Sequence, residues 1–271
     1  MARVTASTRL CFMVGEPIDK ARTPALFNDW AETAGRDAVM TGLSLGADGI
    51  APLFAMMRHA ENCIGAVVTY PHKQAAFAQL DEADETARFN QACNVVRRDP
   101  DGRLVGTMTD GIGCVAAMAG HGARLDGADF LLVGAGGAGS AIAHEAVCRG
   151  AARIVVLELD TARRAVLMDR LASAFPDLAV LAHPPDDFRF DVACNATPLG
   201  MKGEATLPFP AERLPAHTLV VDVVPTPAMT PWLEAARARG LRVQTGPEMV
   251  AAQFAHVAGF LLGVPPGSIQ V

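Results

Sequence analysis

A glycine-rich turn near the middle of the chain carries the most specific chemical signal. Residues 130–139 read Phe-Leu-Leu-Val-Gly-Ala-Gly-Gly-Ala-Gly, an apolar run that ends in glycines. Gly134 allows a tight turn, Gly136 lets the backbone approach a pyrophosphate, and Gly139 lets the next helix pack on its strand. The first N–H groups of that helix then face the phosphates. The pattern predicts a dinucleotide site at Gly134, Ala135, Gly136, Gly137 and Ala138.

An acidic sequence follows the second strand of this motif. Residues 154–157 form an apolar run that ends in Glu158, Leu159 and Asp160. A carboxylate at this place accepts hydrogen bonds from a free ribose 2′-hydroxyl, and two carboxylates repel a 2′-phosphate. The sequence therefore favours NAD over NADP. Arg163 lies one turn later and keeps NADP open as an alternative.

Lys73 and Asp110 are the residues most suited to proton transfer. Lys73 follows a predicted strand at 66–70, and Asp110 stands at the entry to the nucleotide-binding half. A carboxylate beside a lysine can tune its pKa, so that the lysine exchanges a proton with a substrate hydroxyl as hydride moves. Each residue also has a plainer interpretation. Lys73 could be a solvated first-turn lysine, and Asp110 could simply cap a helix at 111–118.

The segments that must position these residues alternate between extended and helical patterns. In the first half we expect strands at 11–14, 66–70 and 93–98, and helices at 71–80 and 82–90. Thr23 and Pro24 are expected to open another helix as its N-cap and first residue. After the glycine turn we expect a helix at 161–175, strands at 178–182, 191–195 and 218–224, and a helix opened by Thr230 and Pro231.

This order predicts an α/β fold with a doubly wound, Rossmann-type second half. The last predicted helix, 247–262, is apolar on most sides, and no strand is expected after it. We therefore expect it to return to the first half. The predicted domains are a discontinuous substrate-binding domain, 1–109 with 244–271, and an NAD(P)-binding domain, 110–243. The cleft between two such domains is the natural place for a site.

The composition narrows the partners of the protein. The chain has 271 residues, of which 51% are hydrophobic, and a formal net charge of −6. This charge argues against nucleic acid and anionic membranes and favours a small-molecule partner. Six scattered cysteines without a CxxC pair indicate neither zinc nor disulfides. We expect a cytoplasmic enzyme without a transmembrane segment, either a monomer or a homodimer.

Short motifs along nearly the whole chain resemble those of the shikimate/quinate dehydrogenases. In order, they are Gly15-Glu16-Pro17-Ile18, Arg22-Thr23-Pro24, Asn28, Val68 to Lys73, Ala92-Cys93-Asn94, Thr109-Asp110-Gly111, Gly134 to Gly137, Asn195 to Pro198 and Gln253. The resemblance implies reversible hydride transfer between a nicotinamide and the ring carbon that bears the hydroxyl or ketone of a cyclic hydroxy acid. This would be the C3 position of shikimate, quinate or a close relative.

The resemblance also implies roles for particular residues. Lys73 and Asp110 match the catalytic pair. The ring hydroxyls or carboxylate would be held by Thr23, Thr69, Asn94 and Gln253. Helix capping by Thr23 and a polar stripe at Gln253 are the plainer alternatives. Beyond the glycine turn and residues 158–163, the cofactor would contact Asn195, Ala196, Thr197, Val223 and Gly246.

Two departures from the family pattern concern the substrate. Ala21 stands where a hydroxyl normally meets the substrate carboxylate, and Pro225 replaces an aromatic residue. A missing charge-assisted hydrogen bond weakens binding by roughly tenfold to a hundredfold, unless Lys20 or Arg22 compensates. Alternatives are therefore a dehydrogenase of a related cyclic carboxylate, such as an aminoshikimate, and a non-catalytic NAD-binding sensor. A short-chain dehydrogenase is disfavoured, because the sole tyrosine, Tyr70, lies three residues before Lys73 rather than four.

Overall fold

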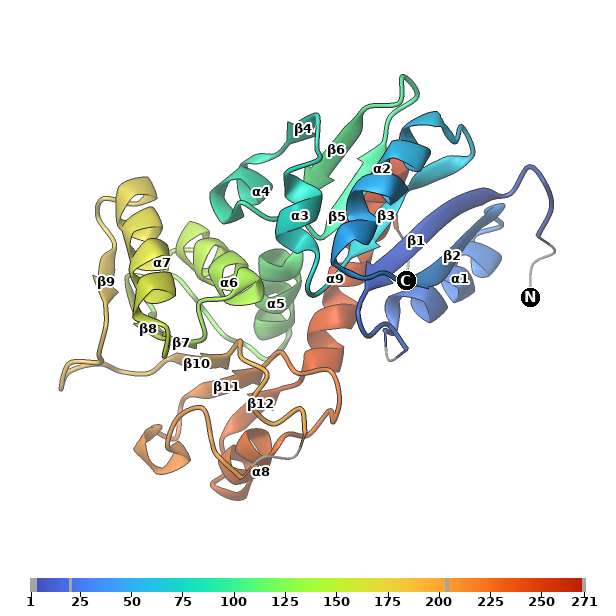
Figure 1. Ribbon diagram of the computed structural model, residues 1–271. Coiled ribbons are helices and arrows are strands. Elements are labelled where there is room, and N and C mark those ends of the chain that lie inside the picture. Colours follow the sequence, from blue (N-terminus) through green and yellow to red (C-terminus); the bar gives the residue numbers. More distant parts are fainter. Residues whose placement is uncertain (1–3, 20, 203–204, 270–271) are drawn as a thin grey trace. The chain divides into compact units, whose positions relative to one another are not determined.

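The chain folds into two compact α/β units, as the sequence predicts for the fold class. The computed structural model describes residues 4–19, 21–202 and 205–269. Unit 1 comprises Met1–Thr109 with Gln253–Val271, and unit 2 comprises Asp110–Ala252. The long helix α9 (Gly246–Leu262) begins in unit 2 and ends in unit 1. Figure 1 shows both units, with α9 near the red end of the colour scale.

Unit 1 is built on a mixed six-stranded sheet with the order β2-β1-β3-β5-β6-β4. β1 pairs in parallel with β2 and β3, and β5 runs antiparallel to β3 and β6. The strands are β1 (Arg9–Gly15), β2 (Ala38–Ser44), β3 (Cys63–Val68), β4 (Glu82–Ala83), β5 (Val95–Arg98) and β6 (Leu104–Thr107). The helices that precede α9 are α1 (Thr23–Thr33), α2 (Ile50–His59), α3 (Lys73–Phe77) and α4 (Glu85–Asn90).

Both faces of this sheet are covered, because apolar side chains alternate along the central strands. On β1, Phe12 and Val14 pack with α2, whereas Cys11 and Met13 face the opposite way. That opposite face is covered by α1 and by the C-terminal part of α9, which supplies Phe254, Val257, Ala258 and Leu261. The end of the chain therefore completes the core in which the chain began.

Three predicted elements of unit 1 differ in the structure. Thr23 is not the cap of α1: Arg22 holds that position and no side chain caps the helix. The helix predicted at 82–90 divides into β4 and α4, because the Asp84 carboxylate accepts the Ala87 N–H at 2.8 Å and starts a new helix. Of the helix predicted at 71–80, only α3 is helical. The chain leaves the helix before residue 80, because the Asp81 N–H bonds to Leu104 O of the neighbouring strand just ahead of β4.

Unit 2 contains a parallel six-stranded sheet with the order β12-β11-β10-β7-β8-β9. The strand order reverses beside β7, which is where ligands bind in open parallel sheets. The strands are β7 (Asp129–Val133), β8 (Arg153–Leu157), β9 (Ala179–Leu181), β10 (Val192–Asn195), β11 (Leu219–Asp222) and β12 (Arg242–Gln244). The helices are α5 (Asp110–Gly120), α6 (Gly137–Cys148), α7 (Thr161–Ala174) and α8 (Pro231–Ala238). Short 3₁₀ turns occur at Ala47–Gly49, Ala211–Arg213 and Pro266–Ser268.

The elements of unit 2 lie close to the predicted ranges, apart from β12, which the sequence did not indicate. Thr230 accepts the Leu233 N–H and caps α8 as expected. α8 buries Trp232, Leu233 and Ala236 against the sheet residues Leu131 and Val220. This packing fixes one face of the sheet that carries the glycine turn.

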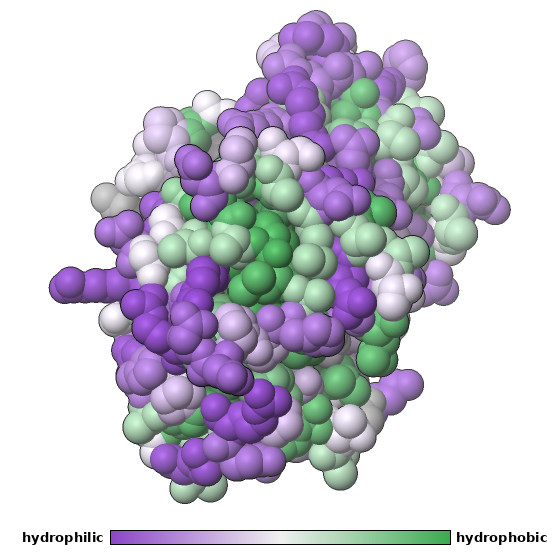
Figure 2. Space-filling model, turned by 90° about the vertical axis from the view of Figure 1, so that its left-hand side faces the viewer, coloured by the Kyte–Doolittle hydropathy of each residue, from purple (hydrophilic) through white to green (hydrophobic). Residues whose placement is uncertain are grey.

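On the face drawn in Figure 2, hydrophilic and hydrophobic residues are intermixed, with a group of strongly hydrophobic residues near the centre of the view. Of the helices that the structure describes, none is both long enough and apolar enough to cross a membrane.

We predict that Gly139→Ala destabilises unit 2. A β-carbon at this position would overlap the Gly134 carbonyl oxygen, which belongs to the backbone and cannot move aside alone. We expect a loss of about 1–3 kcal/mol in the free energy of unfolding, measured by urea titration. Gly120→Ala is the matched control, because no atom lies within 4 Å of the added carbon. Equal stability of the two variants would contradict the close-packing role of Gly139.

Candidate active site

The glycine turn of unit 2 connects β7 to α6. Gly134 has a positive φ of +100°, and a β-carbon there would collide with Thr197 and Ala196. By contrast, added β-carbons at Gly136 and Gly137 would meet no atom within 4 Å. Gly136 is the N-cap of α6, and no side chain caps that helix. The open backbone at the start of α6 can therefore receive the phosphates of a dinucleotide.

Glu158 is held against this turn at the end of β8. Its Oε2 accepts the Ala135 N–H at 2.9 Å and its Oε1 accepts the Asp160 N–H at 3.1 Å. Burial acts to raise the pKa of this carboxyl, but the two N–H donors and the charge of Arg163 hold it below its ordinary value. Glu158 is therefore an anion, and a carboxylate has acceptor capacity beyond these two bonds.

The residues beside Glu158 have different surroundings. Leu159 is 99% exposed. Asp160 caps α7 by accepting the Ala162 and Arg163 N–H groups. The residue predicted to contact the cofactor therefore also stabilises a helix. Arg163 lies 3.8 Å from Glu158 and 3.6 Å from Asp160, which directs its charge toward these carboxylates.

Asn195 shapes the second loop of unit 2. Its side chain is buried; Oδ1 accepts from the backbone N–H and the hydroxyl of Thr197, at 3.0 and 2.6 Å. Its Nδ2 donates to Leu199 O at 3.2 Å and to the Asp222 carboxylate at 3.1 Å. Asn195 thus holds the loop that presents Ala196 and Thr197.

Asp222 was not singled out from the sequence. It lies at the end of β11, is buried, and accepts hydrogen bonds from Asn195, Val224 N–H and Thr230. Burial raises the pKa of this carboxyl despite those donors. It anchors Val224 in the segment that includes Val223. Gly246 is close-packed nearby, since a β-carbon there would collide with Val224 O. The sequence signal that could have identified Asp222 is an acidic residue at the end of an apolar strand.

In unit 1, Thr69 and Asn94 lie at the same end of the central strands β3 and β5. Thr69 follows β3 and bonds through its N–H to Val14 O at 2.8 Å, while Asn94 O accepts the Val68 N–H at 2.7 Å. Lys73, half-buried, begins α3, and its carbonyl accepts the Cys93 N–H at 3.0 Å. Burial raises the pKa of the Cys93 thiol to about 12, so this cysteine is no nucleophile beside the lysine.

Thr109 brings Asn94 and Gln253 together within unit 1. Its N–H donates to Asn94 Oδ1 at 2.8 Å, and its hydroxyl oxygen accepts from Asn94 Nδ2 at 3.1 Å. The same oxygen accepts from Gln253 Nε2 at 2.7 Å. Gln253 therefore makes a specific tertiary hydrogen bond and is not only a polar position on its helix. The sequence named Asn94 and Gln253 but missed Thr109, although it directly precedes Asp110.

The N-terminal part of the predicted substrate site is less polar. Ala21 is half-buried beside an apolar cluster, and its N–H bonds to Ile18 O at 3.0 Å. Thr23 is half-buried in the first turn of α1 and is not engaged as a cap. Asn28 joins α1 to β2 by bonding to Met40 O at 3.0 Å and Met40 N–H at 2.8 Å. Of the two residues that could compensate for Ala21, Lys20 lies outside the described residues and Arg22 is exposed.

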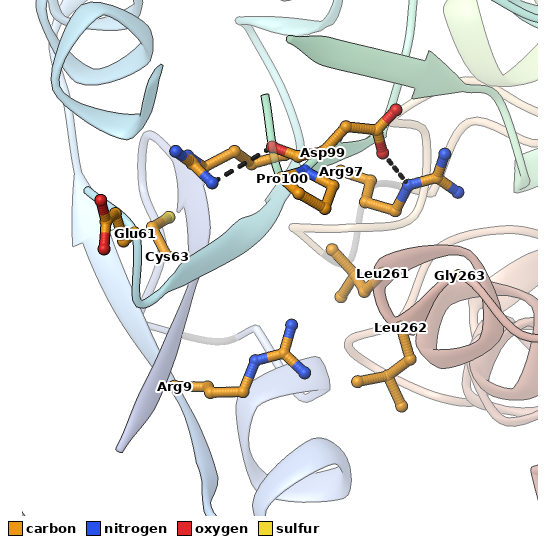
Figure 3. Close-up of a pocket in the computed structure, with 10 residues that line it drawn as sticks. Arg9, Glu61, Cys63, Arg97, Asp99, Pro100, Leu261, Leu262 and Gly263 are labelled. Carbon is orange, nitrogen blue, oxygen red and sulfur yellow. Dashed lines mark hydrogen bonds and ion pairs between the residues drawn. The ribbon is translucent and has the colours of Figure 1, made fainter. Parts of the chain in front are cut away.

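A cavity of about 570 Å³ lies at the opposite ends of β1 and β3 (Figure 3). Its walls include Arg9, Arg97, Arg98 and Leu261, and none of the predicted site residues. Arg97 bonds to Asp99 at 2.7 Å and lies over the Phe260 ring. Arg98 donates to Arg58 O and Asp99 O. Most of these arginine donors serve the fold, and Glu61 and Asp99 offset their charge, so the cavity specifies no ligand.

Three of the histidines have structural partners or surroundings. His72 is buried, and its Nε2 lies 2.6 Å from Leu45 O. His121 lies 3.0 Å from Glu248, and His144 lies beside Phe175. Across residues 4–19, 21–202 and 205–269, no group of three or more His, Cys, Asp or Glu side chains could hold a metal ion.

Comparison with known proteins decides the family. Residues 13–96 match the family described as Shikimate dehydrogenase substrate binding domain. The chain is 35% identical over 271 aligned residues to Shikimate dehydrogenase (NADP(+)) from Acidiphilium cryptum (strain JF-5), covering 97% of this chain and 94% of the relative. The chain belongs to the shikimate dehydrogenase family. It is therefore an oxidoreductase that acts on a CH–OH group.

Solved structures share the whole two-unit fold. A quinate dehydrogenase from Corynebacterium glutamicum in complex with NAD matches with a TM-score of 0.84 and 30% identity, over 97% of both chains. A ligand-free 5-ketofructose reductase from Gluconobacter sp. strain CHM43 matches with a TM-score of 0.85 and 28% identity, over 97% of this chain and 96% of the other. The fold of this family thus accompanies more than one substrate, and the site residues must specify it.

Proposed function

We propose that this member of the shikimate dehydrogenase family is an NAD(P)-dependent dehydrogenase. It would exchange hydride reversibly between a nicotinamide and C3 of shikimate, quinate or a close ring acid. The observation that carries this proposal is the cluster in which the buried Asn94 and the half-buried Gln253 both bond to Thr109, in the unit that also carries Thr69 and Lys73. Such a cluster suits a ligand with several hydroxyl groups.

Lys73 and Asp110 supply the proton chemistry in this proposal. The nicotinamide, when bound, accepts or supplies the hydride. Lys73 takes the hydroxyl proton as the C–H bond breaks and returns it in the reverse direction. Asp110 is buried at the first residue of α5. Its carboxylate is assigned to orient the lysine toward the substrate hydroxyl. Substrate positioning by Thr23, Thr69, Asn94 and Gln253 belongs to the same proposal.

We propose NAD as the preferred cofactor. Glu158 is an anion fixed at the end of β8, where the ribose of the nucleotide is expected, and Leu159 offers no cation for a 2′-phosphate. The quinate dehydrogenase relative holds NAD, which agrees with this assignment. The Acidiphilium relative is named for NADP(+), and Arg163 is the residue through which NADP could still bind.

A second candidate substrate is favoured by Ala21. The methyl group of Ala21 supplies no donor for a carboxylate, so a related cyclic carboxylate with other contacts, or a polyhydroxy ketone without a carboxylate, would fit. The 5-ketofructose reductase has the same fold. A non-catalytic NAD-binding sensor is a weaker candidate, because Lys73 and Asp110 are both retained.

A substrate panel tests the proposal directly. Shikimate, quinate, an aminoshikimate and 5-ketofructose would each be assayed with NAD and NADP, or with the reduced cofactors for the ketone. The highest kcat/KM is expected with shikimate or quinate. A protein that binds NAD and turns over none of the four would favour the sensor.

We predict that Lys73→Ala lowers kcat by about 100-fold or more, because a positioned proton-transfer group typically contributes this much. Asp110→Asn should be similarly damaging. The Kd of NAD should change little in both variants, as measured by calorimetry. Arg36→Ala, which removes an exposed cation in unit 1, is the control and should keep full activity. Near wild-type kcat in both site variants at saturating substrate would remove the pair from the mechanism.

For the cofactor, we predict a higher kcat/KM with NAD than with NADP. Leu159→Arg combined with Glu158→Asn should move the preference toward NADP by about tenfold or more, because a cation replaces an anion near the 2′ position. Leu159→Gln with Glu158→Asn is the control for the added cation. A wild-type preference for NADP would show that Glu158 does not select the ribose.

Ala21→Ser is predicted to lower KM for shikimate or quinate by several-fold with little change in kcat, the signature of added uniform binding. Ala25→Ser, the same change at an exposed position of α1, is the control. An unchanged KM would indicate that another group already meets the carboxylate. A raised KM would indicate a pocket shaped for a different ligand.

A further inference from the structure

We infer that Thr109 is a positioning residue that fixes the side-chain amides of Asn94 and Gln253 for the substrate. This inference rests on the proposed function, in which those two amides hold ring hydroxyls. Thr109 is buried, with 2% of its surface exposed, and Asn94 has 3% exposed. Gln253 is half-buried beside this buried pair, where an unsatisfied amide is costly.

The donor directions in this cluster follow from one backbone group. The Thr109 N–H can only donate, and it faces Asn94 Oδ1 at 2.8 Å. The Asn94 Nδ2 donates to the Thr109 hydroxyl oxygen at 3.1 Å, and that hydroxyl donates to Asn94 Oδ1 at 3.3 Å. The Thr109 hydroxyl oxygen also accepts from Gln253 Nε2 at 2.7 Å. The amides of Asn94 and Gln253 thus both donate to one hydroxyl oxygen.

Thr109 also occupies a special place along the chain. It is the last residue of the first segment of unit 1, and Gln253 is the first residue of the second segment. The hydrogen bond between them joins residues 144 positions apart. It therefore ties together, inside unit 1, the two points at which the chain passes to unit 2. Asp110 follows directly, so the residue that orients both amides also leads into the proposed catalytic carboxylate.

Replacement of Thr109 by valine and by serine separates the hydroxyl from the shape of the side chain. Valine keeps the shape but leaves the Asn94 and Gln253 donors without the hydroxyl oxygen that accepts them. The Gln253 amide can then rotate away, and Asn94 is held only by the Thr109 backbone N–H. Serine keeps the oxygen. We expect Thr109→Val to raise the substrate KM by about tenfold or more and to lower kcat less, with the Kd of the dinucleotide within about twofold of wild type.

Thr109→Ser should restore KM to within about threefold of the wild-type value. A valine variant with wild-type KM, or a serine variant as damaged as the valine variant, would overturn the inference. Urea unfolding of both variants shows whether the protein remains folded at the assay temperature.

A double-mutant cycle tests whether Thr109 acts through its partner. In a Gln253→Ala background, Thr109→Val should raise KM by a clearly smaller factor than in the wild-type background, because one of its two targets is already absent. Equal factors in both backgrounds would show that Thr109 does not act through Gln253.

A measurement that does not depend on enzyme activity separates this inference from the proposed function. The measurement is NMR of the full-length protein without substrate. The side-chain NH₂ signals of Gln253 are assigned by their loss in Gln253→Glu. In Thr109→Val these signals should shift, and their protons should exchange faster with water. Unchanged signals would overturn the inference even if the enzyme is active. A wild-type protein inactive on the whole substrate panel, with shifted Gln253 signals in Thr109→Val, would refute the proposed substrate and leave the positioning role supported.

Discussion

The apolar face of α9 places the strongest constraint on this protein. Phe254, Val257 and Leu261 are buried against a face of the first sheet that α1 covers only in part. Burial of each such side chain contributes roughly 1.5–3 kcal/mol, so the chain must return to the unit in which it began. Because Gln253 lies at the beginning of this buried face, its contact with Thr109 is a consequence of core packing.

The second unit depends on a different constraint, the close approach of backbone at the glycine turn. Gly134 and Gly139 have no room for a β-carbon, whereas Gly136 and Gly137 are open. The first two residues pack α6 on the sheet, and the other two leave open space at the start of α6. Glu158 and Asn195 complete the arrangement by bonding to backbone N–H groups of the neighbouring loops. The same polar residues therefore stabilise the fold and border the proposed nucleotide site.

Family membership defines the reaction class more firmly than the substrate. The relatives share a fold that accompanies names as different as quinate dehydrogenase and 5-ketofructose reductase. Within that fold, hydrogen-bond donors and acceptors select the ligand, since one unpaired polar group changes affinity by an order of magnitude. In the proposed function, Ala21 and the Thr109 cluster contribute to this selection, the first by a missing hydroxyl and the second by the amides that it holds.

The sequence alone determined the elements with strong local signals. The strands β7 to β11 of unit 2 are largely apolar runs, and Thr230 with Pro231 opens α8, so these elements could be predicted within a few residues. The local signals at Thr23 and at 82–90 were misleading. Arg22 rather than Thr23 holds the cap position, and Asp84 accepts a backbone bond that divides the expected helix.

Tertiary structure decided the contacts that join distant residues. No local pattern marks Thr109 as the partner of Asn94 and Gln253, because the last of these contacts spans 144 positions of the chain. Asp222 likewise became significant only when β11 placed it beside Asn195 and Thr230. Sequence patterns report periodicity and capping within a few turns, whereas burial of a polar group and the identity of its partner are set when separate elements pack together.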